Sequence, residues 1–211
     1  MDLYLCDYKP EKGLFKLIPK NKKTFIIANA KDYSNDLVKR KEKERKNSKW
    51  LKKFGLDTEI LDLREYFGKK NLLRKKIGTA GVLWVSGGNT FVLRQAMHLS
   101  GFDEILKSLI KKKNILYCGS SAGTCIMGPS LKGLNLVDSI KPKPYGKIPT
   151  IWEGLGILNY VIIPHYRSKH PESKLIEKTV NYCIKNKILF KAIKSGEAIV
   201  IRTGELNARN F

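Results

Sequence analysis

The chain has 211 residues, of which 41 are Lys or Arg and 19 are Asp or Glu, so its formal net charge is +22. This length suits one domain that buries a sizeable core without a metal or disulfide staple, and we expect a single domain over residues 1–211. No charged and then apolar N-terminal leader and no apolar run near about 18 residues is present, so we expect neither a signal peptide nor a membrane span.

The positive charge could indicate a nucleic-acid or anionic-membrane partner. Its distribution argues against both, because arginines are few and spread out, whereas nucleic-acid readers favour clustered Arg with aromatic side chains. The densest run, residues 39–53, contains Glu42 and Glu44, which is typical of a solvated helix face. We therefore expect no nucleic acid and no membrane as partner, and a monomer or homodimer.

The four cysteines are scattered and form no Cys-x-x-Cys pair; they are Cys6, Cys118, Cys125 and Cys183. This spacing suggests neither a zinc site nor a disulfide framework. We interpret them as reduced thiols of a cytoplasmic protein, and we expect no metal and no cofactor.

The first third of the chain alternates short apolar runs with turn residues. It predicts strands at residues 3–6, 24–28 and 58–61, and a helix at 36–54 that is capped by Ser34 or Asn35 and ends at Gly55. A further apolar run at 14–18 is bounded by prolines and a glycine, and its structure stays undecided.

The middle of the chain continues this alternation. We predict helices at 72–77, 91–99 and 102–112, and a strand at 81–85 that is apolar throughout, as expected of a strand buried on both faces. A strand from residue 115 then leads into a glycine turn and a further helix. Strands alternating with helices predict an α/β fold of three layers, a parallel sheet with mixed edges and helices on both faces.

The last third begins with a polar, proline-rich loop at 131–150, and loops of this length are usually functional or mobile. An apolar strand at 161–165 follows and ends at His165. We predict a helix at 174–187 and closing strands at 188–193 and 198–201, joined around Ser195 and Gly196.

Residues 119–123 read Gly-Ser-Ser-Ala-Gly and fit Gly-x-Ser-x-Gly, the nucleophile elbow between a strand and a helix. Glycines on either side let the backbone turn sharply. Only Ser121 lies two residues from a glycine on both sides, whereas Ser120 occupies the variable position, so Ser121 is the candidate nucleophile. The alternative is an ordinary turn built from small residues.

A serine nucleophile needs a base, and the chain has three histidines. His98 lies in a predicted helix and His170 in a polar stretch, which favours surface or capping roles. His165 follows a buried strand, at the edge where ligands bind in parallel α/β sheets, and is the candidate base. Its alternative is a strand-end histidine satisfied by the backbone.

The base needs an acidic partner. If the chain order is Ser, acid, His, two residues qualify, Asp138 and Glu153, and either could instead be a solvated loop carboxylate. An oxyanion also needs two N–H donors. Ala122 supplies one and Gly88 is the candidate for the other. Gly87 and Gly88 could instead form a simple strand-to-helix turn; a phosphate cradle is disfavoured, because neither Gly-x-Gly-x-x-Gly nor a Walker lysine is present.

Several of these stretches occur together in a known family. They are residues 88–91 (Gly-Asn-Thr-Phe), 119–123, and 163–165 (Ile-Pro-His), supported by 29–33 and 154–157. In order and spacing the chain resembles peptidase family S51, the family of peptidase E (aspartyl dipeptidase) and cyanophycinase, over nearly its whole length. Thr124 departs from the commoner Ala of the elbow, and the acid loop is rich in proline and lysine.

The resemblance implies a flavodoxin-like fold similar to class I glutamine amidotransferases, with Ser121 as nucleophile, His165 as base and Gly88 and Ala122 as oxyanion donors. It favours Asp138 over Glu153 as the third residue. We expect a serine peptidase acting on short peptides, with dipeptides that carry an N-terminal Asp as candidate substrates and with Asn89 and Arg167 binding the substrate. The alternatives are a non-hydrolytic amidotransferase-like binding module and a basic nucleic-acid-associated protein.

Overall fold

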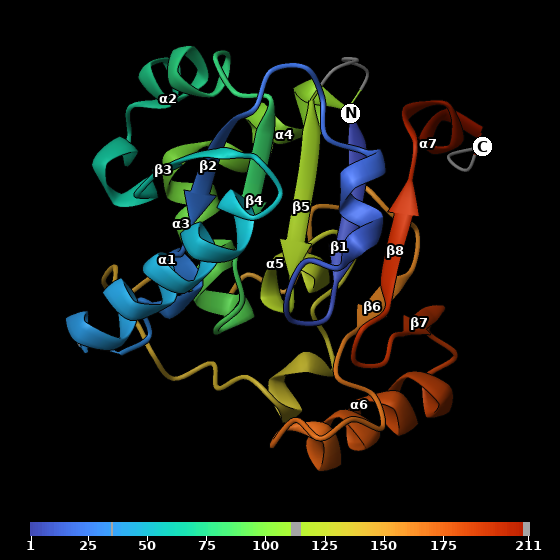
Figure 1. The fold of residues 1–211 in the computed structure, drawn as a ribbon. Coiled ribbons are helices and arrows are strands. Elements are labelled where there is room, and N and C mark those ends of the chain that lie inside the picture. Colours follow the sequence, from blue (N-terminus) through green and yellow to red (C-terminus); the bar gives the residue numbers. More distant parts are fainter. Residues whose placement is uncertain (35, 111–114, 209–211) are drawn as a thin grey trace.

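A computed structural model describes residues 1–34, 36–110 and 115–208. Its centre is a six-stranded sheet in the order β3-β2-β4-β5-β1-β8 (Figure 1). In chain order the strands are β1 (Asp2–Cys6), β2 (Lys23–Ile27), β3 (Asp57–Ile60), β4 (Val82–Val85), β5 (Leu116–Ser120) and β8 (Ala198–Ile201). All neighbours pair in parallel except β1 and β8, which are antiparallel. The fold is therefore the predicted α/β class with one mixed edge.

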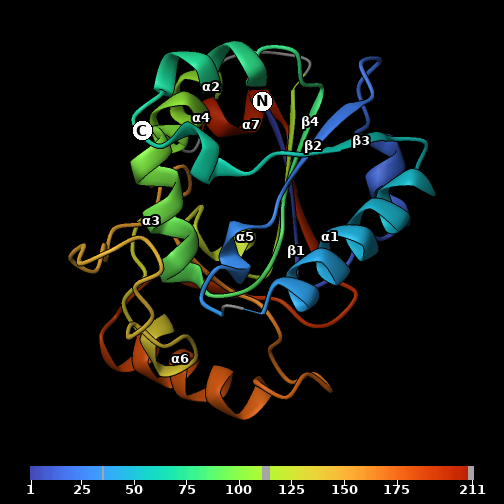
Figure 2. The ribbon, with the colours of Figure 1, turned by 90° about the vertical axis from the view of Figure 1, so that its left-hand side faces the viewer.

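Helices cover both faces of this sheet, as Figure 2 shows. One face carries α2 (Lys70–Ile77), α3 (Thr90–Ser100) and α4 (Phe102–Leu109), and the other carries α1 (Leu37–Lys52). Successive side chains of β4 enter different cores: Leu83 and Val85 pack on the first side, and Val82 and Trp84 on the second. All of β4 is buried, which explains its continuous apolar run, since a strand alternates its side chains between two covered faces.

A smaller unit lies beyond the carboxyl ends of the central strands (Figures 1 and 2). It contains a second, parallel pair of strands, β6 (Val161–Ile163) and β7 (Phe190–Ala192), with α6 (Ser173–Lys185) packed on them. The expected strand at 161–165 therefore stops two residues early. Pro164 has no N–H for a strand ladder, and the backbone of His165 is left-handed, with φ of 63°. The two closing strands also fall into different sheets.

The ends of several other elements also differ from the predicted ones. Asp36 caps α1, its side chain accepting a hydrogen bond from the N–H of Lys39, whereas Ser34 does not; Asn35 lies outside the described residues. The undecided run at 14–18 forms part of a 3-10 helix, η1 (Lys12–Lys16). The end of the helix expected at 102–112 also falls outside the described residues. A short helix α7 (Thr203–Ala208) follows β8 and was not expected.

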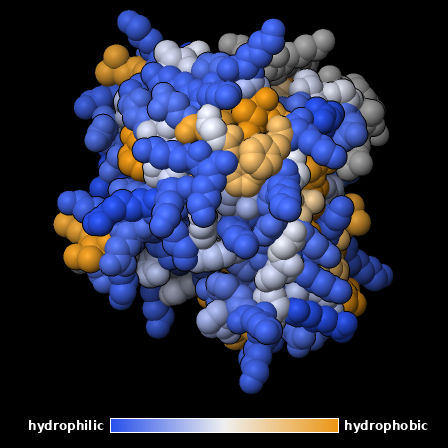
Figure 3. All heavy atoms as spheres, in the orientation of Figure 1, coloured by the Kyte–Doolittle hydropathy of each residue, from blue (hydrophilic) through white to orange (hydrophobic). Residues whose placement is uncertain are grey.

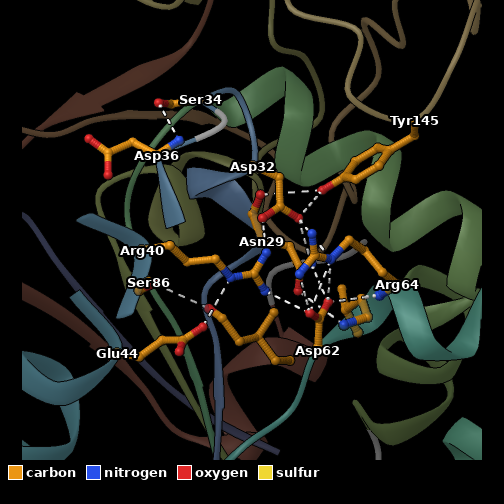
Figure 4. A network of polar contacts seen from close by, with 12 residues as sticks. Asn29, Asp32, Ser34, Asp36, Arg40, Glu44, Asp62, Arg64, Ser86 and Tyr145 are labelled. Atoms are coloured by element: carbon orange, nitrogen blue, oxygen red, sulfur yellow. Dashed lines mark hydrogen bonds and ion pairs between the residues drawn. The ribbon is translucent and has the colours of Figure 1, made fainter. Parts of the chain in front are cut away.

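A buried cluster of charges joins α1 to the segments that follow β2 and β3 (Figure 4). The guanidinium of Arg40 pairs with Asp32 and, at 2.9 Å, with Asp62. Asn29 donates hydrogen bonds of 2.9 Å to both carboxylates, and the hydroxyl of Tyr145 reaches Asp32 at 2.5 Å. Each buried charge therefore has partners of opposite sign, and the cluster fixes η2 (Asn29–Lys31) against α1.

The outer surface is mostly hydrophilic, and apolar side chains are scattered over the face seen in Figure 3. Within the described ranges, none of the helices combines the length and the apolar character that a membrane crossing requires. All four cysteines are buried free thiols.

We predict that Arg40→Met lowers the free energy of unfolding by about 3 kcal/mol, because removing one partner of a buried ion pair leaves carboxylates without their counter-charge. Urea unfolding followed by circular dichroism measures this loss. The matched control is Lys41→Met, which removes the same kind of charge from an exposed position of the same helix. Equal losses in the two variants would contradict the role given to the cluster.

Candidate active site

The candidate nucleophile lies at a sharp turn between a strand and a helix. β5 ends at Ser120, and the short helix α5 (Ala122–Cys125) begins directly after Ser121. Ser121 itself has φ of 50° and ψ of −109°, a conformation that non-glycine residues rarely adopt. The backbone is thus strained at the residue whose hydroxyl lies beside Nε2 of the candidate base.

Close backbone packing explains the two glycines of this turn. A Cβ atom on Gly119 would lie 2.4 Å from the carbonyl oxygen of Gly123, and a Cβ on Gly123 would lie 2.2 Å from that of Val85. The hydroxyl of Tyr117 also donates to the Gly123 carbonyl at 2.7 Å. Side chains at either position would push α5 away from the sheet. The two glycines are therefore required for close packing.

The two adjacent serines make different contacts. The hydroxyl of Ser120 donates to the carbonyl of Tyr8 at 2.7 Å, whereas Oγ of Ser121 lies 3.0 Å from Nε2 of His165. Nucleophile and base must be within hydrogen-bond reach, and only Ser121 meets this condition. The geometry agrees with the serine selected from the Gly-x-Ser-x-Gly spacing.

His165 follows β6 and is only 2% exposed. Its left-handed backbone turns the ring back toward the central sheet, and Ser168 donates a hydrogen bond of 2.9 Å to its carbonyl. One face of the ring stacks on His170, with the ring centres 3.9 Å apart and the planes 11° from parallel. The imidazole is therefore held in a fixed orientation, with Nε2 toward Ser121.

The carboxylate that approaches the other ring nitrogen comes from Asp7, directly after β1. Its Oδ2 lies 3.7 Å from Nδ1 of His165, and the side chain is buried. Burial by itself would raise the pKa of this carboxyl, but polar contacts with His165, Ser195 and Gly196 outweigh it and hold the pKa below its ordinary value. Asp7 is thus a buried, ionised carboxylate beside the candidate base, and the sequence reasoning did not select it.

The structure does not bring the two predicted acids to His165. Asp138 accepts a hydrogen bond of 2.8 Å from the N–H of Thr90, at the start of α3, and burial raises its pKa to about 6. Glu153 is exposed, and its backbone carbonyl accepts from Arg94. Among the described residues, the ion pair to His165 is made by Asp7 and not by either of them.

The predicted oxyanion donors flank the turn. In the described part of the chain, no backbone acceptor is found for the N–H of Gly88 or of Ala122. Gly88 has φ of 154° and packs so closely on Ala30 that a Cβ would lie 2.3 Å from its carbonyl oxygen. Asn89 is occupied: its side chain caps α3 and donates to the carbonyl of Ser139 at 2.7 Å.

A cavity of about 270 Å³ opens beside Ser121. Two lysines, Lys31 and Lys43, contribute to its wall, and so do two carboxylates, Asp138 and Glu172. Arg167, predicted to bind substrate, is exposed, lies outside this wall and stacks on Tyr166. The two lysines were missed because both stand among many surface lysines in the sequence.

Lys43 is the less usual of the two. Its ammonium lies over the rings of Tyr8, at 4.8 Å, and Trp50, at 5.7 Å, and among the described residues it makes no ion pair with a carboxylate. Burial, together with the nearby charges of Lys31 and Lys46, lowers its pKa to about 8. The wall of the cavity therefore carries a partly buried cation without a counter-ion.

One group of side chains near the site could be considered for metal binding. His165, His170 and Glu172 offer ligand atoms within 4.8 Å of one another. The two imidazole rings are stacked nearly parallel, so their in-plane lone pairs lie in separate planes and do not converge on one point. This arrangement suits ring packing better than shared coordination of an ion.

Comparison with known proteins agrees with these features. A model of peptidase family S51 matches residues 19–209. An uncharacterized peptidase of Listeria monocytogenes is 31% identical over 160 residues, 75% of this chain and 73% of that protein. A Drosophila melanogaster protein named "Probable alpha-aspartyl dipeptidase" is 26% identical over 143 residues, which cover 63% of this chain and 57% of that protein.

A solved structure gives the same picture. The crystal structure of a candidate peptidase E from Listeria monocytogenes EGD-e superposes with a TM-score of 0.75 at 26% identity, covering 95% of this chain and 94% of that one. Sheet order, turn and sequence likeness together define a hydrolytic enzyme with a flavodoxin-like α/β fold. The chain belongs to peptidase family S51, and it is a peptidase.

We predict that Gly123→Ala destabilises the protein by about 1 to 3 kcal/mol, because the new methyl group collides with the Val85 carbonyl. It should also displace Ser121 and slow labelling by a fluorophosphonate probe. The control is Gly13→Ala, where a Cβ meets nothing within 4 Å. Chemical denaturation and probe labelling measure the two effects, and a stable, fully reactive Gly123→Ala variant would contradict this account.

Proposed function

We propose that the protein is a serine peptidase that hydrolyses short peptides, with Ser121 as nucleophile and His165 as general base. The observation that carries this proposal is the 3.0 Å contact between Oγ of Ser121 and Nε2 of His165, at a strained turn that borders a cavity. The geometry of the turn agrees with that of a nucleophile elbow.

The chemistry follows from these positions. Nε2 of His165 takes the proton of Ser121 while Oγ bonds to the carbonyl carbon of the scissile peptide. The carbonyl electrons move onto oxygen, and the N–H groups of Gly88 and Ala122 stabilise that charge, since neither donates to a backbone acceptor among the described residues. The imidazolium then gives its proton to the departing amine. Water repeats the sequence on the acyl group and regenerates Ser121.

The walls of the cavity support a substrate that is short and acidic. Its volume of about 270 Å³ lies near the lower end of small-molecule sites, which usually span about 300 to 1,000 Å³. Among the described residues no carboxylate pairs with Lys43, and a substrate carboxylate beside it would supply the missing counter-ion. We therefore propose a preference for peptides with an N-terminal Asp, recognised by Lys43 and Lys31 in place of Arg167.

The same cavity carries groups suited to the other charge of a peptide N-terminus. Asp138 and Glu172 border it. Their negative charges repel each other, so a positively charged group between them would be bound favourably. An α-ammonium group beside them would relieve that repulsion. The arrangement supports an exopeptidase that requires a free amino terminus over an enzyme that cuts within long chains.

We predict that Ser121→Ala abolishes peptidase activity, with a loss of about a millionfold in turnover, and that His165→Ala is similarly inactive. Ser120→Ala should retain most activity, because its hydroxyl bonds to the backbone of Tyr8. Dipeptide hydrolysis and fluorophosphonate labelling measure these effects. An inactive Ser120→Ala beside an active Ser121→Ala would overturn the assignment.

We predict that Asp-Leu is cleaved much faster than Asn-Leu, which has the same shape without the charge. In Lys43→Met the kcat/KM for Asp-Leu should fall about 10- to 100-fold, the usual effect of a lost charged contact, while that for Asn-Leu stays nearly constant.

Arg167→Met is the matched control for this prediction and should leave both rates unchanged, because Arg167 is exposed outside the cavity. Equal rates of the unmodified enzyme on the two dipeptides would contradict the acidic preference. If Arg167→Met cleaved Asp-Leu and Asn-Leu at equal rates, Arg167 would be the residue that recognises the substrate carboxylate.

A further inference from the structure

The second nitrogen of the candidate base has an incomplete environment. Nδ1 of His165 is buried, and among the described residues no group lies within hydrogen-bond distance of it. A histidine base needs a partner here, because a proton held on Nδ1 leaves Nε2 free to accept from the serine. Burying a polar atom without a hydrogen-bond partner also costs free energy, so we expect an acceptor close to Nδ1.

The group that meets this need is the carboxylate of Asp7. Its Oδ2 lies 3.7 Å from Nδ1, which is close enough for an ion pair but longer than a hydrogen bond. Catalytic hydrogen bonds are often long in structures without substrate and shorten in the complex. Oδ1 already accepts from the N–H of Gly196 at 3.4 Å, so Oδ2 is the oxygen left for the histidine.

Sheet pairing fixes this carboxylate beside the nucleophile. In the parallel pair of β1 and β5, Cys6 stands opposite Ser120, so the next residues along each strand, Asp7 and Ser121, leave the sheet together. On the other side of β1, Cys6 stands opposite Ala198 of β8, which places the preceding Ser195–Gly196 turn against Asp7. The position of Asp7 therefore depends on backbone ladders and not on the long loop at 131–150.

Asp138, the acid expected from the sequence, makes a different contact. Its carboxylate accepts from the N–H of Thr90, where it stabilises the first turn of α3, and it faces the cavity. Among the described residues, no hydrogen bond or ion pair joins Asp138 to His165, whereas Asp7 makes one.

We infer that Asp7 is the positioning residue for His165, so that the acid of this site precedes the nucleophile in the chain and the order is Asp7, Ser121, His165. This inference rests on the proposed function. Asp7 stays ionised throughout: it holds the Nδ1 proton in place and stabilises the imidazolium that forms when Ser121 loses its proton. No proton passes to the carboxylate.

The test is Asp7→Asn in the full chain. Asn keeps the size of the side chain and an oxygen for Gly196, but its amide would donate to Nδ1 and place the histidine proton on Nε2. We expect kcat to fall about 10,000-fold with little change in KM. Asp7→Glu, which restores the charge, should recover part of the loss, and circular dichroism should show both variants folded.

The matched comparison is Asp138→Asn, which removes the same charge from the other carboxylate and should lower kcat about 10-fold or less. Loss of activity in Asp138→Asn with full activity in Asp7→Asn would overturn the inference and return the acid to the loop.

A pH profile separates orientation of the base from a purely structural role. The groups that face His165 are Asp7, His170 and Glu172, with Lys169 at the rim. Without the carboxylate, the imidazolium loses its stabilising charge, so the acid limb of the kcat/KM profile should move down by at least about one pH unit in Asp7→Asn. Glu153→Gln, which changes an exposed acid outside the cavity, should leave that limb in place. An unmoved limb in Asp7→Asn would contradict the inference.

Proton NMR tests the pairing without using activity. At low pH the protonated histidine should show a far-downfield Nδ1–H resonance that is lost in Asp7→Asn and kept in Asp138→Asn and Ser121→Ala. If the enzyme cleaved no peptide but this resonance depended on Asp7, the proposed function would fail and the pairing would stand. If the resonance were unaffected by Asp7→Asn, the pairing would fail whatever the activity.

Discussion

The parallel pairing of β5 between β1 and β4 is the constraint on which the site depends. Parallel strands in register end at the same edge, so residues that are far apart in the chain leave the sheet side by side. Gly87 and Asp7 flank Ser121 in this way, and a Cβ on Gly87 would lie 2.8 Å from that of Ser121. Crowding at this edge explains why the residues around the strained serine are small.

The histidine comes from outside that sheet, and this makes the small unit of β6, β7 and α6 essential. Its apolar cluster holds β6, and Thr179 of α6 donates to the carbonyl of Gly133 at 3.0 Å, which joins the unit to the long loop. The contact between Ser121 and His165 thus spans two packed bodies. A shift of either by an ångström would separate nucleophile and base, so packing far from the cavity supports its chemistry.

Buried and exposed charges are balanced differently in this protein. The surface carries a large excess of lysine, in agreement with a net charge of +22, while the buried Arg40 is matched by Asp32 and Asp62. Lys43 lies one helical turn from Arg40 on α1 and lacks such a partner among the described residues. Because the neighbouring cluster fixes the helix, this cation is held at the cavity wall, where a ligand can neutralise it.

The sequence by itself determined the alternation of strands and helices and the parallel sheet, because period-two burial is a local property, and its glycine spacing selected Ser121 over Ser120 as the candidate nucleophile. It also selected His165 among three histidines. It could not place β6 in a separate sheet, nor show that Asp138 accepts a hydrogen bond from the N–H of Thr90 while Asp7 approaches the histidine. An assumed chain order kept Asp7 out of consideration, although a carboxylate directly after a buried strand was a usable signal. Strand order and register decide which strand ends become neighbours, and these are set by long-range packing that no local pattern encodes.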